Sequence, residues 1–277
     1  MSLSIKFPAA PDVPARAPLY VTPPPAWDPQ VVADLARRSR IEADAVDRGL
    51  WLVAQDERAT LEIYLASHSL RYGVVEADGE PRHSEPIDAE RARAIADGWV
   101  AEFGPAEARF DVGSITEAEL LVSTSPDSEP ERFVTAVQVN YAFAIGDLPV
   151  IGSGGKMQVA VDPGGEISGA YRFWREPREK GAVRVLPTAQ AFERFAASAL
   201  FRNLSDDTAK AEVTEVTLGY FALPPTEPQS VLLPAYEFRG VLSTELHPRY
   251  EFIAHLPAAA VKPAELKNLG RPTAIPG

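Results

Sequence analysis

The chain has no cysteine, fewer basic than acidic residues, and no long apolar run. Zero cysteines among 277 residues exclude disulfides, thiol nucleophiles and thiolate metal sites. With 27 basic and 39 acidic residues the net charge is −12, which repels a phosphate backbone and argues against nucleic acid as a partner. Because no run of about 18 apolar residues exists, the sequence predicts no transmembrane segment.

Catalytic and metal-binding motifs are also missing. The segment Gly152-Ser153-Gly154 precedes a predicted strand, whereas a serine nucleophile elbow precedes a helix, and a phosphate loop needs glycine where Val150 stands. Acidic loops at 76–85 and 125–131 do not have the calcium-loop pattern and are predicted to be solvated. None of the four histidines has metal-pair spacing, and we expect structural or exposed roles for them: His68, His83, His247 and His255. We therefore expect no catalytic residue, no metal and no cofactor.

Proline is abundant and concentrated at the start. Eight of the 26 prolines fall in the first 29 residues, a density that excludes helix and predicts an extended arm over 1–26. The arm lacks the apolar centre of a secretory signal, so we expect a cytoplasmic protein, or an envelope protein if a leader or anchor was removed. Leu19 to Thr22 has strand character. We expect 18–22 to pair with a sheet edge in its own chain, or in a second subunit, which would give a homodimer.

Between the arm and the C-terminal tail, the hydrophobic period switches between 2 and 3.6. Alternating apolar residues predict antiparallel strands, including two hairpins at 60–75 and 157–174. Asp88 is the predicted N-cap of a helix that ends at Gly104, and Thr188 is the predicted N-cap of another. A shorter helix is predicted to begin after Asp28.

The hairpin-then-helix order occurs twice, which predicts two tandem similar lobes. We expect an α+β fold in which each lobe is an antiparallel sheet with a helix packed on one face. The lobes are predicted at 27–125 and 132–257, followed by a tail at 258–277, with the boundary in the Ser/Pro/Glu-rich loop. The alternative is a chance match, since any α+β chain can give such a pattern.

A group of large aromatic and arginine side chains forms the candidate ligand-binding site. Its members are Trp99, Tyr141, Tyr171, Arg172, Trp174, Arg175 and Tyr236. On one interpretation the rings line a groove between the lobes and the arginines orient an anionic or peptide ligand. On the other, the rings fill the core and Arg175 pairs with Glu176 or Glu179 at the surface.

Several short segments of the second half resemble a known family. They are Leu148–Lys156, Phe173–Arg175, Leu218–Tyr220 with Gln229, and Leu233–Tyr236. They resemble the C-terminal region of YycI-type regulatory proteins, and the order of strands, hairpin and helix is similar to a PepSY-type module. The resemblance covers about 134–257.

This resemblance implies a non-catalytic binding or regulatory module of the cell envelope that acts through a protein or peptide partner. Such modules are often anchored by an N-terminal membrane helix, which this sequence lacks. The alternative function is an enzyme or small-molecule-binding protein of a biosynthetic pathway, with an aromatic cleft between the two lobes. A deep closed cavity containing Trp174 and an acid or base with a shifted pKa would favour that alternative.

Overall fold

The computed structural model describes residues 4–75, 85–105, 108–123, 125, 128–202, 209–245 and 249–259. Its helices are α1 (Pro29–Arg38), α2 (Ala89–Phe103), α3 (Thr188–Ala196) and α4 (Ala199–Arg202). The strands of the first half are β1 (Ser4–Lys6), β2 (Arg16–Val21), β3 (Val46–Asp47), β4 (Trp51–Gln55), β5 (Ala59–Tyr64), β6 (Leu70–Val74) and β7 (Arg109–Val122). Those of the second half are β8 (Glu131–Ile145), β9 (Leu148–Ile151), β10 (Lys156–Val161), β11 (Ile167–Phe173), β12 (Arg178–Arg184), β13 (Lys210–Phe221), β14 (Val231–Leu232), β15 (Pro234–Ser243) and β16 (Tyr250–Pro257).

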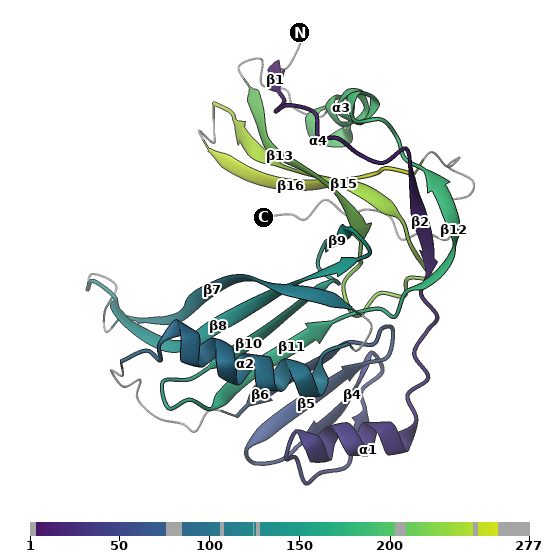
Figure 1. Ribbon diagram of the computed structural model, residues 1–277. Helices are drawn as coiled ribbons and strands as arrows, with labels where there is room; N and C mark the ends of the chain where they lie inside the picture. Colours follow the sequence, from purple (N-terminus) through teal and green to yellow (C-terminus); the bar gives the residue numbers. More distant parts are fainter. Residues whose placement is uncertain are drawn as a thin grey trace.

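One large sheet runs through the molecule and is bent into the shape of a C (Figure 1). It has 13 strands in the order β16-β15-β13-β9-β8-β10-β11-β6-β5-β4-β3, with β1 beside β13 and β7 beside β8. The bend lies at β9, which pairs antiparallel with β8 and parallel with β13. We call β3 to β8, β10 and β11 the lower limb, and β1, β13, β15 and β16 the upper limb.

The helices cover the outer face of the sheet on both limbs. In Figure 1, α1 and α2 lie against the lower limb and α3 and α4 lie above the upper limb. A second sheet, in the order β12-β2-β14, lies on the outside of the bend. Because side chains alternate along a strand, each limb turns its core residues outward to the helices and the residues between them to the inner face of the C.

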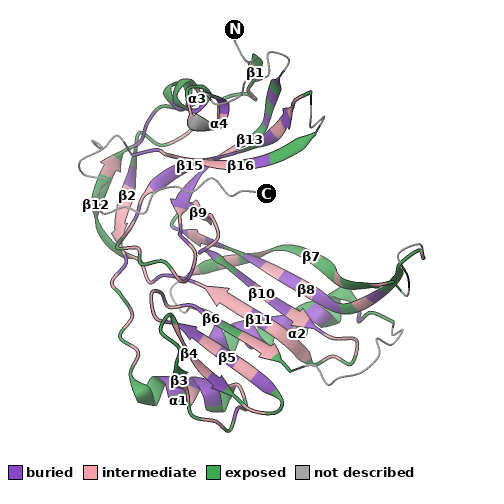
Figure 2. Cartoon of the chain, turned by 180° about the vertical axis from the view of Figure 1, so that it is seen from behind, coloured by how far each residue is buried: buried purple, intermediate pink, exposed green. Residues whose placement is uncertain are grey.

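Each limb has its own hydrophobic core under its helices. In the lower limb, buried residues of α2 such as Ala96 and Trp99 pack with Val139 and Tyr141 of β8. In the upper limb, Phe195 of α3 stacks on Phe238 of β15 with ring centroids 4.0 Å apart. Figure 2 shows buried segments along the strands of both limbs, whereas β12 is largely exposed. The two cores therefore lie on one face of a single sheet.

Two of the three predicted helix starts are confirmed. Asp28 and Asp88 are N-caps, and the Asp88 carboxylate accepts a hydrogen bond of 2.8 Å from the backbone N–H of Arg91. The prediction of Thr188 as an N-cap is wrong, because α3 begins at Thr188 and Pro187 occupies the cap position. The Thr188 hydroxyl instead donates to the carbonyl oxygen of Pro11 at 3.1 Å, which ties the arm to the helix.

The α+β class with antiparallel strands is confirmed, but the tandem two-lobe arrangement is not. The expected boundary lies within a hairpin, since β7 and β8 pair up to Val122 and Glu131. The two hairpins that were assigned to different lobes lie in one sheet, where β6 pairs with β11. Two separate lobes would each have an edge strand whose backbone N–H and C=O groups lack partners. When the two edges join, these groups form hydrogen bonds with each other. The limbs are instead divided at β9.

The proline-rich arm is part of the fold and pairs with its own chain. β2 pairs with β12 on one side and β14 on the other, and β1 pairs with β13. The predicted strand character of 18–22 is thus found, although β2 is the central strand of a small sheet and not an addition to an edge. Ala17 is 1% exposed, which shows how closely the arm is packed. The homodimer stays a prediction.

No helix within the described ranges is both long and apolar enough to cross a bilayer. The predicted tail is described only at Ala258 and Ala259, which are buried, and 260–277 lie outside the described residues.

Candidate functional site

The inner face of the lower limb carries a row of polar and aromatic side chains. The strand registers place one residue from each of six neighbouring strands in this row: Ser114, Asn140, Gln158, Tyr171, Arg71 and Glu62. The next row contains small residues, namely Ala160, Gly169, Gly73 and Thr60. The inner face is therefore a polar surface beside a shallow strip of small side chains.

Amide side chains in and beside this row are fixed by hydrogen bonds to one another. The Nε2 of Gln158 donates to Oδ1 of Asn140 at 2.7 Å and to Oε1 of Gln138 at 3.3 Å. The Nδ2 of Asn140 donates to the Thr116 hydroxyl at 3.3 Å. An amide carries two donors and two acceptor sites, so these groups keep capacity for a ligand while their orientation is set.

Aromatic rings lie beside the amides on the same face. Tyr171 stacks on Phe173 with ring centroids 4.6 Å apart, and the ammonium of Lys156 lies 5.6 Å from the Tyr171 centroid. Phe173 in turn contacts Tyr64 edge to face at 5.8 Å. Burial raises the pKa of the Tyr171 phenol, so this hydroxyl stays protonated near neutral pH.

A cleft opens where the two limbs face each other. It has a volume of about 360 Å³. The lower limb contributes Gly113, Asn140, Ala142 and Lys156, the upper limb contributes Glu237, Arg239, Ile253 and His255, and Gly152 and Ser153 lie at the bend. Since residues of both limbs line it, a ligand here would touch both halves of the bent sheet. This cleft, together with the adjoining amides, is the candidate site.

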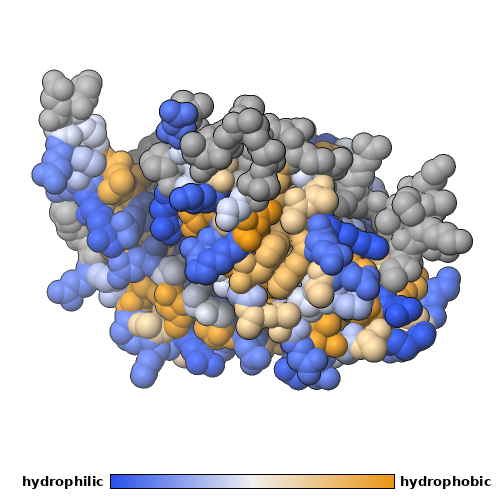
Figure 3. Space-filling model, turned by 90° about the horizontal axis from the view of Figure 1, so that it is seen from above, coloured by the Kyte–Doolittle hydropathy of each residue, from blue (hydrophilic) through white to orange (hydrophobic). Residues whose placement is uncertain are grey.

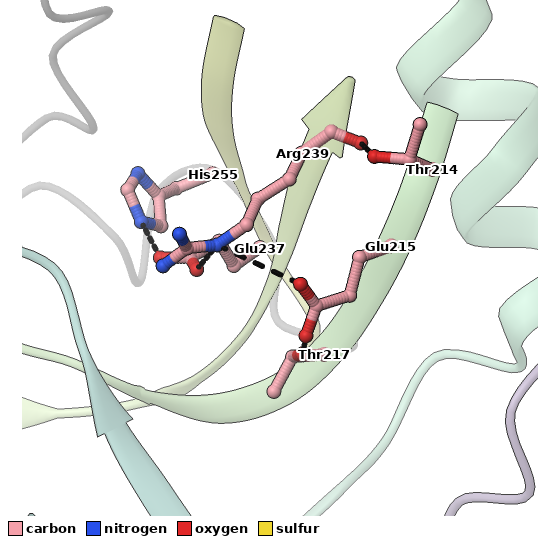
Figure 4. A network of polar contacts seen from close by, with 6 residues as sticks. All are labelled: Thr214, Glu215, Thr217, Glu237, Arg239 and His255. Atoms are coloured by element: carbon pink, nitrogen blue, oxygen red, sulfur yellow. Dashed lines mark hydrogen bonds and ion pairs between the residues drawn. The ribbon is translucent and has the colours of Figure 1, made fainter. Parts of the chain in front are cut away.

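The upper wall of the cleft is organised around a buried carboxylate (Figure 4). The Glu237 side chain is 7% exposed, and Oε1 accepts from Nε of Arg239 at 2.7 Å while Oε2 lies 2.9 Å from Nε2 of His255. The Arg239 guanidinium also lies 4.0 Å from Glu215, which accepts from the Thr217 hydroxyl. Burial by itself would raise the pKa of Glu237, but the hydrogen bonds from His255 and Arg239 outweigh it and lower that pKa.

The lowered pKa predicts an acid-sensitive contribution of Glu237 to stability. A group whose pKa is lower when folded stabilises the fold above its ordinary pKa of 4.5, and this contribution is lost as the pH falls through the folded value. We expect Glu237→Gln to lower the free energy of unfolding by about 1 to 2 kcal/mol at pH 7. The loss should shrink between about pH 5 and pH 3, measured by urea unfolding at each pH.

The control for this prediction is Glu251→Gln. Glu251 lies on the same sheet but is 74% exposed, so its substitution should change stability little at any pH. A loss at Glu237 that is equal at pH 7 and pH 3 would contradict the assignment.

The polar network is suited to holding charges in place. Both oxygens of Glu237 have partners, so it is not available as a free general base. Within the described ranges, no group of three or more histidine, aspartate and glutamate side chains is arranged to hold a metal ion. The arrangement therefore fixes the positions of the charged groups on the upper wall.

The structure does not bring the predicted aromatic site residues together. Trp99, Tyr141 and Trp174 belong to the lower core, and Tyr236 to the upper core. The Tyr141 hydroxyl donates to Asp97 at 2.8 Å, and burial together with that carboxylate raises its pKa. Tyr171 alone of the predicted rings faces the inner surface, as its place in the polar row shows. The core interpretation describes the other four rings.

The two predicted arginines are buried and bind backbone carbonyls. Arg172 donates to the carbonyl oxygens of Phe103 and His68. Arg175 is 3% exposed and donates to those of Leu223 at 2.6 Å, Pro224 at 2.8 Å and Glu227 at 2.6 Å. Burial lowers the pKa of both guanidinium groups to about 10, so both are charged at neutral pH.

The predicted surface pairing of Arg175 with Glu176 or Glu179 is wrong, because its guanidinium points inward to the loop that follows β13. Arg175 thereby joins the end of the lower limb to the upper limb.

Of the predicted site residues, Tyr141 lines the cleft, and sequence reasoning missed the other residues of the lining. The sequence did contain one signal, the alternation of side chains along β15. There, Glu237 and Arg239 alternate with the core residues Tyr236 and Phe238. The pairing of Glu237 with His255 across β15 and β16 depends on a register that composition does not reveal. His255 and His68 have structural partners, as expected, whereas His83, His247 and the acidic loop at 76–84 lie outside the described residues.

Other cavities lined by described residues lie away from the cleft. One of about 180 Å³ is lined by Trp99, Phe103 and Tyr72, and one of about 650 Å³ lies between α1 and the segment that follows it. Seen from above, hydrophobic patches are separated by hydrophilic side chains (Figure 3). The cleft differs from both cavities in having facing polar walls from two limbs.

Comparisons with known proteins inform the fold alone. No family model matches the chain, and no curated protein matches it. Among solved structures, one similar chain is an uncharacterized protein from Eubacterium rectale ATCC 33656, with a TM-score of 0.52 and 10% identity. The match covers 94% of this chain and 90% of that one. The arrangement of strands and helices therefore resembles that of a protein determined by crystallography.

Proposed function

We propose that the protein is a non-catalytic binding or regulatory module that holds an extended peptide segment of a partner protein in the cleft. The observation that carries this proposal is the cleft itself, which is open and lined on facing limbs by polar side chains. On the upper wall, Glu237, Arg239 and His255 are held in place by one another. Because these side chains are already ordered, binding a ligand costs less conformational entropy.

The amides beside the cleft suit a peptide backbone. A side-chain amide offers the same donor and acceptor as a peptide group, and Asn140 and Gln158 lie on adjacent strands of the inner face. The strip of small residues next to them leaves room for an extended chain. The resemblance to YycI-type and PepSY-type modules, which implies a protein or peptide partner, agrees with this proposal.

The alternative, an enzyme or small-molecule-binding protein with an aromatic cleft, has less support. Trp174 is 5% exposed, and its ring centroid lies 4.9 Å from that of Phe143, in the core and away from the cleft. Glu237, the buried acid of the cleft, has a partner on each oxygen.

Capture of peptides from a synthetic library by the immobilised full-length protein tests the proposal. The library consists of random eight-residue peptides, and the captured peptides are identified by mass spectrometry. We expect Ala142→Trp to abolish capture, because Ala142 is exposed in the cleft and an indole there fills it. Thermal unfolding checks that the variant folds.

The matched control is Ala101→Trp, which places the same side chain at an exposed position of α2 on the outer face. It should leave capture unchanged. Recovery of a bound metabolite from native lysate, with no peptide or protein captured, would sink the proposal and support the alternative.

A further inference from the structure

We infer that the cleft recognises a carboxylate of its peptide ligand and holds it between Lys156 of β10 and Arg239 of β15. This inference rests on the proposed function and adds the chemical group that is recognised. Its basis is that the two walls of the cleft carry one cation each, and that Lys156 has no acidic partner among the described residues.

The protein as a whole is acidic, but the lining of the cleft is not. The net charge of the chain is −12. The lining includes two basic residues, Lys156 and Arg239, and one acidic residue, Glu237. Glu215 lies outside the lining but pairs with Arg239 at 4.0 Å. A recessed cationic site concentrates anions even on an acidic protein, because its walls reduce screening by water.

Glu237 does not cancel both cations. Its two oxygens are occupied by Arg239 and His255, on the upper wall. Lys156 lies on the opposite wall and is exposed, and no ion pair joins it to an acidic residue of the described ranges. In the part of the chain that the structure describes, its ammonium contacts the Tyr171 ring alone. Lys156 therefore provides a positive charge that a ligand can neutralise.

Arg239 supplies the second, more directional contact. Its ion pairs with Glu237 and Glu215 are made through Nε. A guanidinium carries five N–H donors, four of them on its terminal nitrogens, and its fork matches the two oxygens of a carboxylate. The side chain is 51% exposed, so a ligand in the cleft can reach those nitrogens.

The ligand is one carboxylate on an extended peptide and not a polyanion. The net charge of −12 repels a nucleic acid or other polyphosphate at longer range, whereas a single carboxylate is attracted at short range. The carboxylate has two possible sources, the C-terminus of the peptide or an aspartate or glutamate side chain. Both present the same group to Lys156 and Arg239.

Binding of captured peptides to the full-length protein, measured by fluorescence anisotropy, tests the inference. The probes are each captured peptide as the free acid, with its C-terminus amidated, and with its acidic side chains replaced by the corresponding amides. We expect one of the two neutral forms to bind about tenfold more weakly, and that form identifies the source of the carboxylate. Raising the NaCl concentration should weaken the acid form more than the neutral form.

The variants place the contact on Lys156 and Arg239. Lys156→Met should weaken binding of the free acid about tenfold and leave binding of the weaker neutral form unchanged. Arg239→Lys keeps a cation beside Glu237 and should also weaken binding of the free acid. Lys180→Met, at an exposed position of β12 outside the bend, should have no effect. Thermal unfolding shows that each variant is folded.

Three results would overturn the inference. If acid and neutral peptides bind equally, or if Lys156→Met weakens both equally, no carboxylate is recognised, while capture that depends on Ala142 still supports the proposed function. If no peptide is captured at all, the proposed function fails and the inference fails with it.

Discussion

Replacing Arg175 with methionine is expected to lower the free energy of unfolding by about 4 kcal/mol. Arg175 lies outside the cleft wall, so this effect concerns stability and not ligand contact. Arg175 is 3% exposed, and its guanidinium donates to three backbone carbonyls of the loop after β13. Methionine fills much of the same volume but leaves those carbonyls without their donor. Chemical unfolding followed by tryptophan fluorescence measures the loss.

Arg178→Met is the matched control. Arg178 is 63% exposed and pairs with Glu176 at 3.3 Å on the surface, where an ion pair contributes little. We expect its stability to lie within about 0.5 kcal/mol of that of the unaltered protein. If the two substitutions have equal effects, the carbonyl contacts of Arg175 do not hold the limbs together.

Deleting residues 1–22 should unfold the upper limb. The Phe7 ring stacks on Phe192 of α3 at 4.4 Å, and the Tyr220 hydroxyl donates to the carbonyl oxygen of Pro18 at 3.0 Å. Loss of β2 also leaves β12 and β14 without the strand between them. We expect a loss of more than about 5 kcal/mol, since several large apolar side chains lose their burial. Circular dichroism and limited proteolysis should show the upper limb unfolded.

The control for the deletion is Lys6→Ala in the intact arm. The ammonium of Lys6 pairs with Glu212 at 2.6 Å, but the side chain is 77% exposed, so the melting temperature should not change. A truncated protein that melts like the intact one would show that the arm contributes nothing to the fold. Solution mass of both proteins tests the predicted homodimer at the same time.

Local structure was predictable from the sequence because its signals are local. Asp88 and Gly104 mark the two ends of α2, and a Cβ at position 104 would clash with the Val100 carbonyl oxygen. The turn between β10 and β11 lies within the predicted hairpin at 157–174, and its Asp162 side chain accepts from the backbone N–H of Glu166 at 2.9 Å. In each case the controlling contact spans only a few residues.

The path of the sheet was not predictable in the same way. Whether β6 pairs with β11 depends on edges that are about a hundred residues apart in the chain, and nothing in either strand specifies its partner. The bend at β9 likewise needs a strand of four residues to pair with β8 on one side and β13 on the other. Repetition of a hairpin and a helix does not distinguish two lobes from one continuous sheet.

The candidate site could not be predicted from the sequence for the same reason. Aromatic residues such as Trp99 and Tyr236 were attractive as ligand contacts, but their place on the apolar face of a strand or helix assigns them to the core. The residues of the opposite parity, Glu237 and Lys156, face the cleft. These two residues face each other only because the sheet bends, so no motif or residue spacing in the sequence predicts the arrangement.

The measurement that tests the cleft most directly is site-specific photo-crosslinking, which the absence of cysteine makes simple. A single cysteine at position 142 or 101 is labelled with a benzophenone maleimide, and a captured peptide is added and illuminated. We expect the Ala142→Cys protein to crosslink the peptide and the Ala101→Cys protein not to crosslink it. Crosslinking from position 101 alone, or equally from both, would contradict binding in the cleft.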